Sequence, residues 1–319
     1  MLRMDGFEFH AATSAEHAVQ LYGTLDEPMY IAGGTDLLPN LKHRIVRPKN
    51  LIGLAGVLGD GVEESDDSWQ IGGGTRLSTL AKCTQIPPLA EAAALVAGPQ
   101  IRNMGTLGGN VLLDTRCLFY NQTEFWRSSL GYCLKAEGDW CHVIDGPKTC
   151  VAAQSSDTVP VLLAMNASIE LLGPDGTRTL SLRELYRFNG MDHLAIQPGE
   201  LLTHVIVAKP GAGFRGTYKK LRRRDSIDFP QLGVAVTGTF EGSTPTSLDI
   251  VVGAVNPQPK PIRKLESFLN QPLTDDAIQQ ISALVEKQTR PQSSITGDAG
   301  WRRSMAGIFA KRALHQLIG

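Results

Sequence analysis

PMYIAGGTDLLPNL, at residues 28–41, has the pattern of a buried strand that turns sharply into a helix. The apolar residues 28–32 predict the strand, Gly33 and Gly34 predict a tight turn, and Thr35-Asp36 predicts a helix start. An amphipathic helix is expected at 15–23 and a second strand at 50–54. The first 55 residues therefore predict a small α/β unit with a parallel pair of strands.

Two glycine clusters are candidates for binding a dinucleotide. Glycines in the 33–34 turn would let the backbone approach a ligand, and the helix start would offer free N–H groups to a phosphate. The alternative is a plain tight turn capped by Asp36, because the pattern is not the G-x-G-x-x-G fingerprint. GTLGGN at 105–110 predicts a second loop for a diphosphate or a flavin edge, or else an ordinary surface loop. The pair favours one dinucleotide bridging both loops, whereas 72–74 is expected to be a structural turn.

Four of the five cysteines gather within 117–150, at Cys117, Cys133, Cys141 and Cys150. Four thiolates suit an iron–sulfur cluster or a tetrahedral zinc ion, and unrelated buried cysteines are the third interpretation. Residues 114–150 show little periodicity, so we interpret them as an insertion ordered by something other than a hydrophobic core. Cys83 lies apart and is expected to be a packing residue, and His142 is expected to be a neighbour of the site.

Composition limits the classes of function. A length of 319 residues predicts two domains, and a net charge of −1 gives no general attraction to nucleic acid or an anionic membrane. Neither a signal peptide nor an apolar run of about 18 residues is found, so a cytoplasmic protein is expected. Motifs of hydrolytic sites such as G-x-S-x-G and H-E-x-x-H are absent from the sequence, and no catalytic residue is expected.

The remaining pattern predicts an α+β protein. The expected helices and strands are a helix at 89–97 stopped by Gly98-Pro99, a helix from 157, a hairpin of 167–172 with 177–182, strands at 200–208, 215–221, 231–240 and 247–255, and helices at 262–269, 274–287 and 299–317. Residues 209–213 are a plausible linker. Strand alternation would place Lys220, Arg222 and Arg224 on one face, from which one could reach an anionic cofactor; a solvated face is the alternative.

Three segments, at 31–41, 101–110 and 300–314, resemble the FAD-binding medium subunits of the xanthine dehydrogenase family of molybdenum hydroxylases. The resemblance implies a two-part FAD-binding domain of PCMH-like, CO dehydrogenase flavoprotein type at 1–212. It implies a small domain of antiparallel sheet and helices at 213–319. The implied partners are a large molybdopterin subunit and a small subunit with two [2Fe–2S] clusters, assembled as a dimer of heterotrimers.

The insertion at 114–150 resembles that of 4-hydroxybenzoyl-CoA reductase β subunits, a branch of the family whose extra loop carries a [4Fe–4S] cluster. The resemblance implies that the four cysteines are the cluster ligands. Electrons would pass from ferredoxin through the cluster, FAD and [2Fe–2S] centres to molybdenum, where a phenolic hydroxyl is removed from a CoA thioester. The alternatives are an FAD subunit of a hydroxylase oxidising another aromatic or heterocyclic substrate, and a non-redox module with a structural zinc.

The resemblance also implies which residues contact FAD. The expected contacts are Tyr30, Ile31, Ala32, Gly33, Gly34, Thr35, Asp36, Leu37, Thr106, Gly108, Gly109, Asn110, Asp157 and Lys220. Leu113 stands where a polar residue would be expected, so it is not included.

Overall fold

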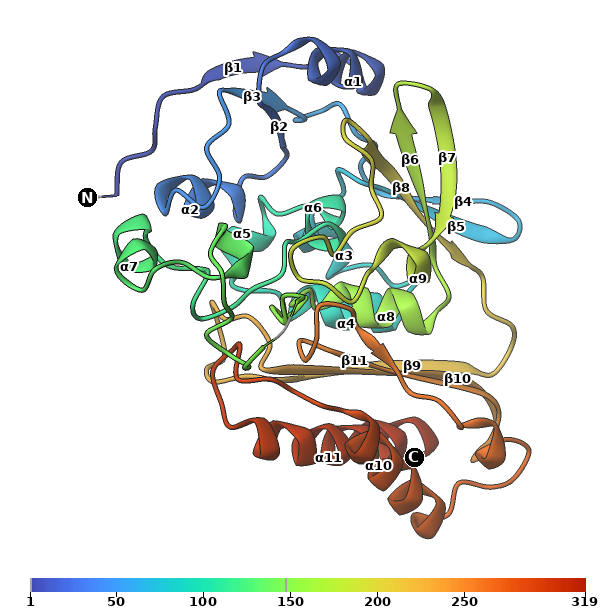
Figure 1. Ribbon diagram of the computed structural model, residues 1–319. Coiled ribbons are helices and arrows are strands. Elements are labelled where there is room, and N and C mark those ends of the chain that lie inside the picture. Colours follow the sequence, from blue (N-terminus) through green and yellow to red (C-terminus); the bar gives the residue numbers. More distant parts are fainter. Residues whose placement is uncertain (1, 147) are drawn as a thin grey trace.

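The computed structural model describes residues 2–146 and 148–319, which form three β-sheets with helices between them (Figure 1). The N-terminal sheet lies at one end of the molecule, and the last two helices lie at the other end. In the described part of the chain, no helix is long and apolar enough to cross a membrane.

The N-terminal unit is a parallel three-stranded sheet in the order β1-β3-β2. Its elements are β1 (Glu8–Ala11), α1 (Ala15–Thr24), β2 (Pro28–Ile31), α2 (Leu37–Lys42) and β3 (Asn50–Gly53). The predicted parallel pair is confirmed as β2 with β3. Strand β1 was not predicted, because its residues are mostly exposed and lack an alternating apolar pattern.

The middle unit is an antiparallel five-stranded sheet in the order β4-β5-β8-β6-β7. Its strands are β4 (Val62–Glu64), β5 (Ser68–Gly72), β6 (Ser168–Gly173), β7 (Gly176–Ser181) and β8 (Leu201–Ala208). The helices that pack with it are α3 (Leu77–Leu80), α4 (Pro87–Ala94), α5 (Pro99–Arg102), α6 (Leu107–Val111), α8 (Thr158–Ala164) and α9 (Leu182–Leu185). The predicted hairpin is confirmed by the pairing of β6 with β7.

Two details of this unit correct the sequence prediction. The helix expected over 89–97 ends at Ala94, and Ala97 adopts a left-handed backbone with φ of 42°. Pro99 begins α5 because a proline fits the first turn of a helix, so Gly98-Pro99 separates two helices. The loop expected at 105–110 contains the short helix α6.

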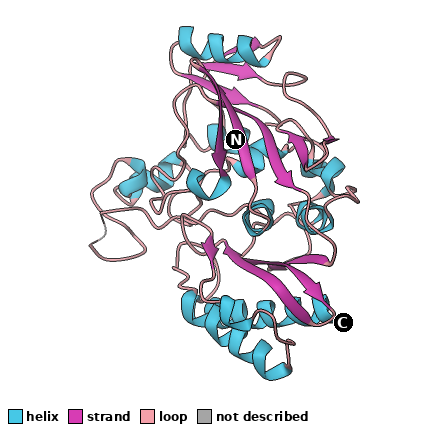
Figure 2. Ribbon diagram, turned by 90° about the vertical axis from the view of Figure 1, so that its right-hand side faces the viewer, coloured by secondary structure: helices cyan, strands magenta, loops and turns pink. Residues whose placement is uncertain are grey.

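The C-terminal unit is an antiparallel sheet in the order β12-β11-β10-β9. Its elements are β9 (Phe214–Leu221), β10 (Leu232–Glu241), β11 (Thr244–Gly253), β12 (Lys260–Pro261), α10 (Asp275–Gln288) and α11 (Ala299–Ile318). Figure 2 shows the two long helices along one face of this sheet. The opposite face packs on α8, where Thr237 Oγ1 donates to the carbonyl of Ala164 at 2.9 Å.

The predicted strands and the helices at 274–287 and 299–317 are confirmed, but the helix expected at 262–269 is wrong. That segment holds only a 3-10 turn at Glu266–Phe268, after Lys264 takes a left-handed φ of 69°. A left-handed residue ends a right-handed helical path, so Leu265 enters the core from a turn. Buried Arg302 joins α11 to the sheet by donating to the carbonyls of Gln231 and Ala254.

The cysteine-rich insertion leaves the middle unit after α6 and returns before α8. It contains α7 (Glu124–Ser129) and a 3-10 turn at Leu134–Ala136. A small cluster of buried residues, including Cys117, Tyr120, Cys150 and Ala152, forms its interior. The insertion therefore has a modest core of its own, in contrast to the sequence prediction.

Candidate functional site

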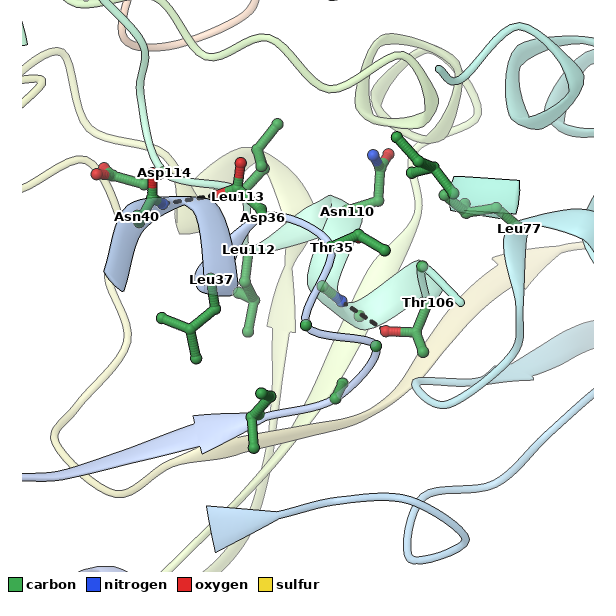
Figure 3. Close-up of a pocket in the computed structure, with 18 of the residues that line it drawn as sticks. Thr35, Asp36, Leu37, Asn40, Leu77, Thr106, Asn110, Leu112, Leu113 and Asp114 are labelled. Carbon is green, nitrogen blue, oxygen red and sulfur yellow. Dashed lines mark hydrogen bonds between the residues drawn. The ribbon is translucent and has the colours of Figure 1, made fainter. Parts of the chain in front are cut away.

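A cavity of about 670 Å³ lies where the turn after β2 meets the turn before α6. Its size falls within the range of about 300–1,000 Å³ that is usual for cofactor sites. Figure 3 shows Thr35 of the first turn beside Asn110 of α6 (Leu107–Val111) at this cavity. We call it the flavin cavity, after the FAD contacts that the sequence resemblance implies.

All but one of the fourteen residues expected to contact FAD line this cavity. The lining residues among them are Tyr30, Ile31, Ala32, Gly33, Gly34, Thr35, Asp36, Leu37, Thr106, Gly108, Gly109, Asn110 and Asp157. Lys220 is the exception, because its side chain is fully buried behind Asp157. Leu113, which was left out, lines the cavity.

The two glycine turns pack directly against each other. A Cβ atom on Gly33 would lie 1.9 Å from the carbonyl oxygen of Met104, and one on Gly108 would lie 2.9 Å from that of Gly73. Glycine is needed at these points for the close approach of two backbones. Residues 72–74 form the expected structural turn and do not belong to the described lining of the cavity.

The side chain of Asp36 does not cap α2, in contrast to the simpler of the two interpretations. Its carboxylate accepts hydrogen bonds from Asn40 Nδ2 at 3.0 Å and from Arg116 Nη1 at 2.6 Å. The side chain of Thr106 is the one that caps, since its Oγ1 accepts from the backbone N–H of Gly109 at 3.2 Å (Figure 3). The carboxylate is therefore held at the rim of the flavin cavity by two side chains.

Asp157 forms the polar part of the cavity wall nearest the C-terminal sheet. Its carboxylate accepts from Lys220 Nζ at 3.0 Å and from the hydroxyl of Tyr218 at 2.8 Å. Burial raises the pKa of Asp157 above its ordinary value, and Lys220 offsets part of that rise. Lys220 Nζ also donates to the carbonyls of Leu95 and Asp228, so all of its donors are used inside the protein.

The basic run after Leu221 does not share one face, in contrast to the prediction. Strand β9 ends at Leu221, so the alternation that places Lys220 inside does not extend to Arg222 and Arg224. Arg222 pairs with Asp228 at 2.5 Å, and Arg224 donates to the carbonyl of Ile227. Together these contacts shape the loop that carries Ile227, Asp228 and Phe229 to the cavity.

Sequence reasoning missed several lining residues, including Asp114, Arg116, Glu200 and Phe229. They come from three separate segments of the chain, and none carries a local motif. Only Arg116 could have been suspected from the sequence, because it is next to Cys117, one of the four clustered cysteines.

The four cysteines of the insertion line one small pocket, which we call the cysteine pocket. Its other lining residues are Phe119, Tyr120, Leu134, Lys135, His142, Val143, Val151 and Ala152. His142 stacks on Phe119 and its Nε2 lies 2.9 Å from the carbonyl oxygen of Tyr132, as expected for a neighbour. Cys83 packs beside the main core, away from this pocket.

Backbone N–H groups point at the sulfur atoms of this pocket. Val143 donates to Cys141 Sγ at 3.4 Å and Ala152 donates to Cys150 Sγ at 3.3 Å. Burial raises the pKa of the Cys117 thiol to about 11, although backbone N–H groups of Phe119 and Tyr120 lower it in part. Such N–H···S bonds are one means by which proteins tune iron–sulfur clusters.

The four thiols are a donor set that suits a zinc ion or an iron–sulfur cluster. In residues 2–146 and 148–319, no three His, Cys, Asp or Glu side chains come together closely enough to hold a single metal ion. Zinc needs four ligands within about 2.3 Å of one point. A four-iron cluster takes one thiolate on each iron, so its ligands stand farther apart. Four thiols line one pocket, so the donor set is of the kind that either group takes.

The fold and the flavin cavity define a dinucleotide-binding subunit. Residues 5–210 match the family model described as the FAD binding domain in molybdopterin dehydrogenase. Residues 216–317 match the CO dehydrogenase flavoprotein C-terminal domain. The chain belongs to this family of FAD-binding subunits.

Relatives of known function cover nearly the whole chain. The carbon monoxide dehydrogenase medium chain of Afipia carboxidovorans is 30% identical over 324 residues, covering 97% of this chain and 96% of its own length. The xanthine dehydrogenase FAD-binding subunit of Escherichia coli O157:H7 is 24% identical, covering 98% and 97%. A chain of reconstituted CO dehydrogenase from Oligotropha carboxidovorans superposes with a TM-score of 0.81 at 27% identity, covering 99% of both chains.

These comparisons confirm the predicted fold class and the family. The domain boundary between residues 212 and 213 stays a prediction. Membership of the reductase branch, which was inferred from the insertion, also stays a prediction.

Proposed function

We propose that this chain is the subunit of a molybdenum-dependent oxidoreductase that holds FAD and a [4Fe–4S] cluster and transfers electrons. The observation that carries the proposal is the arrangement of two pockets on either side of one segment. Leu113, Asp114 and Arg116 line the flavin cavity, and Cys117 lines the cysteine pocket.

The residues of the flavin cavity suit a dinucleotide. The turn at Gly33-Gly34 and the start of α6 bring backbone to the cavity surface without intervening side chains, which suits a diphosphate. Apolar side chains such as Ile31, Leu77 and Leu113 would exclude water from the ring system. Asp157 would offer a fixed polar group, since Tyr218 and Lys220 hold its orientation.

The residues of the cysteine pocket suit a cluster. Cys117, Cys133, Cys141 and Cys150 would be its ligands, and Phe119 and Val143 would limit solvent access. When bound, FAD would supply one- and two-electron chemistry and the cluster would supply one-electron chemistry. The protein itself would position the groups and tune their potentials through hydrogen bonds and burial.

We infer the remaining components from the family and from the insertion. The partners would be a large molybdopterin subunit and a small subunit with two [2Fe–2S] clusters, with ferredoxin as the electron donor. The substrate class would be a hydroxylated aromatic CoA thioester that loses its hydroxyl group, because the insertion resembles that of 4-hydroxybenzoyl-CoA reductases.

A second candidate is an FAD subunit for which electrons flow outward from a substrate that is oxidised. The similarity to the carbon monoxide dehydrogenase medium chain over 97% of this chain favours it. Reduction of the purified complex by ferredoxin, compared with reduction by organic substrate, separates the two directions. Reduction by the substrate alone would favour the outward direction.

Metal and flavin analysis of anaerobically purified protein tests the proposal. We expect about four iron and about four acid-labile sulfide atoms per chain, together with one FAD. Zinc without iron or sulfide would show a structural zinc site and refute the cluster. A colourless protein without flavin would refute the redox function as a whole.

A further inference from the structure

The segment Leu113–Cys117 is a shared wall between the flavin cavity and the cysteine pocket. Within it, Arg116 faces the cavity and Cys117 faces the opposite side. The backbone of Arg116 pairs with Ala153 through two hydrogen bonds of 2.8 Å. This bridge joins the two arms of the insertion between Cys117 and Cys150, so a group that ties these two cysteines together would also fix Arg116.

The side chain of Arg116 reaches two separate parts of the flavin cavity. Its guanidinium donates to Asp36 at the glycine turn, and it lies 3.9 Å from the ring centroid of Phe229 on the loop after β9. The side chain is only 19% exposed. Arg116 therefore connects the insertion with both the turn at 33–36 and the loop at 222–230.

The charges around the cavity single out Arg116. Five carboxylates line the described cavity, and each has a basic partner. Four of those partners are not lining residues, and Arg116 is the only lysine or arginine in the lining that the structure describes. One guanidinium N–H donates to Asp36, and a guanidinium has five, so donors remain for an anionic ligand.

We propose that Arg116 is a positioning residue that makes the affinity for FAD depend on the metal cluster of the insertion. This inference rests on the proposed function. The cluster, by tying Cys117 to Cys150, would hold the bridge to Ala153 and keep the guanidinium at the cavity. There it would attract the anionic diphosphate of FAD and keep Phe229 in place. Because such coupling is reciprocal, bound FAD would also raise the affinity of the chain for the cluster by the same factor.

The experiment is a calorimetric titration of FAD into flavin-free full-length protein, with the cluster present and after its removal by a chelator. In the wild type, the cluster-loaded form should bind FAD about tenfold more tightly than the cluster-free form. In Arg116→Ala the cluster-loaded form should bind FAD weakly, and this ratio should fall close to one. In Arg116→Lys, which keeps the charge and loses the planar fork, the ratio should be intermediate.

Arg312→Ala is the matched control, because Arg312 also lies over an aromatic ring, that of Phe309, and lines neither pocket. It should keep the wild-type ratio. The fraction of iron that the chelator removes at equilibrium gives a second reading, since FAD should lower this fraction in the wild type and not in Arg116→Ala.

The inference is overturned if the wild type takes up both FAD and the cluster but binds FAD equally tightly with and without the cluster. It is also overturned if Arg116→Ala keeps the wild-type ratio of the two FAD affinities. Should Arg116→Ala fail to fold or load iron, Arg116→Lys decides: a lowered ratio supports the inference and an unchanged ratio overturns it. A wild-type chain that takes up FAD and no iron would refute the proposed cluster, and this inference with it.

Discussion

The flavin cavity and the cysteine pocket lie on two sides of one segment, yet they are built in different ways. The cavity is bounded by the ends of strands and short helices, and its two glycine turns touch through backbone atoms. The cysteine pocket is bounded by irregular chain, with left-handed residues at Tyr132 and Glu137. The comparison shows one site shaped by regular elements of the fold beside another built from an irregular insertion with a small core of its own.

The polar groups of the two sites also differ in how the surrounding protein stabilises them. At the flavin cavity, Asp157 is fixed by Lys220 and Tyr218 from the next domain. At the cysteine pocket, burial raises the pKa of the thiols of Cys117 and Cys150, which disfavours the thiolates that a metal needs. A bound metal cluster would supply the positive charge that reverses this balance, and its binding energy would add to the stability of the insertion.

The largest expected effect is that of Cys133→Ser, which removes one of the proposed ligands from the less regular site. We expect complete loss of the cluster and rapid proteolysis within 114–150, because metal binding would supply the ordering energy there. FAD in excess should still bind, since its cavity is formed by other elements. Iron analysis, limited proteolysis and flavin absorbance measure the three outcomes.

Cys83→Ser is the control for that experiment, because Cys83 lies away from the cysteine pocket. It should retain the cluster and the proteolytic pattern of the wild type. Iron retained at the wild-type level in Cys133→Ser would show that this cysteine is not a ligand.

Lys220→Met tests the charge pair behind the flavin cavity. The change leaves the buried carboxylate of Asp157 without its cation and should lower the free energy of unfolding by about 3–5 kcal/mol in urea titrations. Lys219→Met is the matched control, since Lys219 is partly exposed and its contact with Glu91 is 3.4 Å long. Equal losses of unfolding free energy in the two variants would mean that the buried pair is not needed for stability. Adding Asp157→Asn to Lys220→Met should recover much of the free energy lost in Lys220→Met.

Gly33→Ala tests the contact between the two glycine turns. The new methyl group would overlap the carbonyl of Met104, so the turns must separate at a cost of about 1–3 kcal/mol, with weaker FAD binding. Gly109→Ala should cost less, because its methyl group meets only Thr106 Oγ1 at 3.2 Å. Gly23→Ala, with no neighbour within 4 Å, is the control, and calorimetric unfolding that ranks the three otherwise would contradict the packing argument.

The smallest expected effect concerns Glu200, a lining residue of the flavin cavity. The hydrogen bond from Arg178 holds the pKa of Glu200 below its usual value of 4.5. The pair therefore stabilises the fold above pH 4.5, and this contribution is lost as the pH falls through the lower pKa of the folded state. Arg178 is 40% exposed, so the effect should be below about 1 kcal/mol.

Unfolding titrations of Glu200→Gln are made between about pH 3 and pH 7. The unfolding free energy should fall slightly less steeply with decreasing pH in this variant than in the wild type. Glu64→Gln is the control, because Glu64 pairs with Lys209 at the surface. A steeper fall in Glu200→Gln would contradict the assigned sign.

Much of the fold follows from local pattern. The turn at 33–36, the hairpin of β6 with β7 and the helices α10 and α11 carry strong periodicity or turn residues, and the structure has all of them. The helix expected at 262–269 is absent, and tertiary contacts hold Leu265 and Ile262 in the core on irregular backbone. Strand β1 was not predicted because a short exposed strand has no alternating pattern of apolar and polar residues.

The sequence by itself determined that two glycine turns and four clustered cysteines are the chemical features of this chain. The roles of these two residue types can be inferred from the local sequence. Glycine allows a close approach of two backbones, and cysteine supplies the thiolate that a soft metal binds. Only the tertiary structure decided that Arg116 faces the flavin cavity, and that Lys220 lies behind Asp157 and not at the cavity surface. The contacts of Arg116 with Asp36 and Phe229 and of Lys220 with Asp157 span more than 60 residues of chain, and no local pattern encodes a contact made across such a distance.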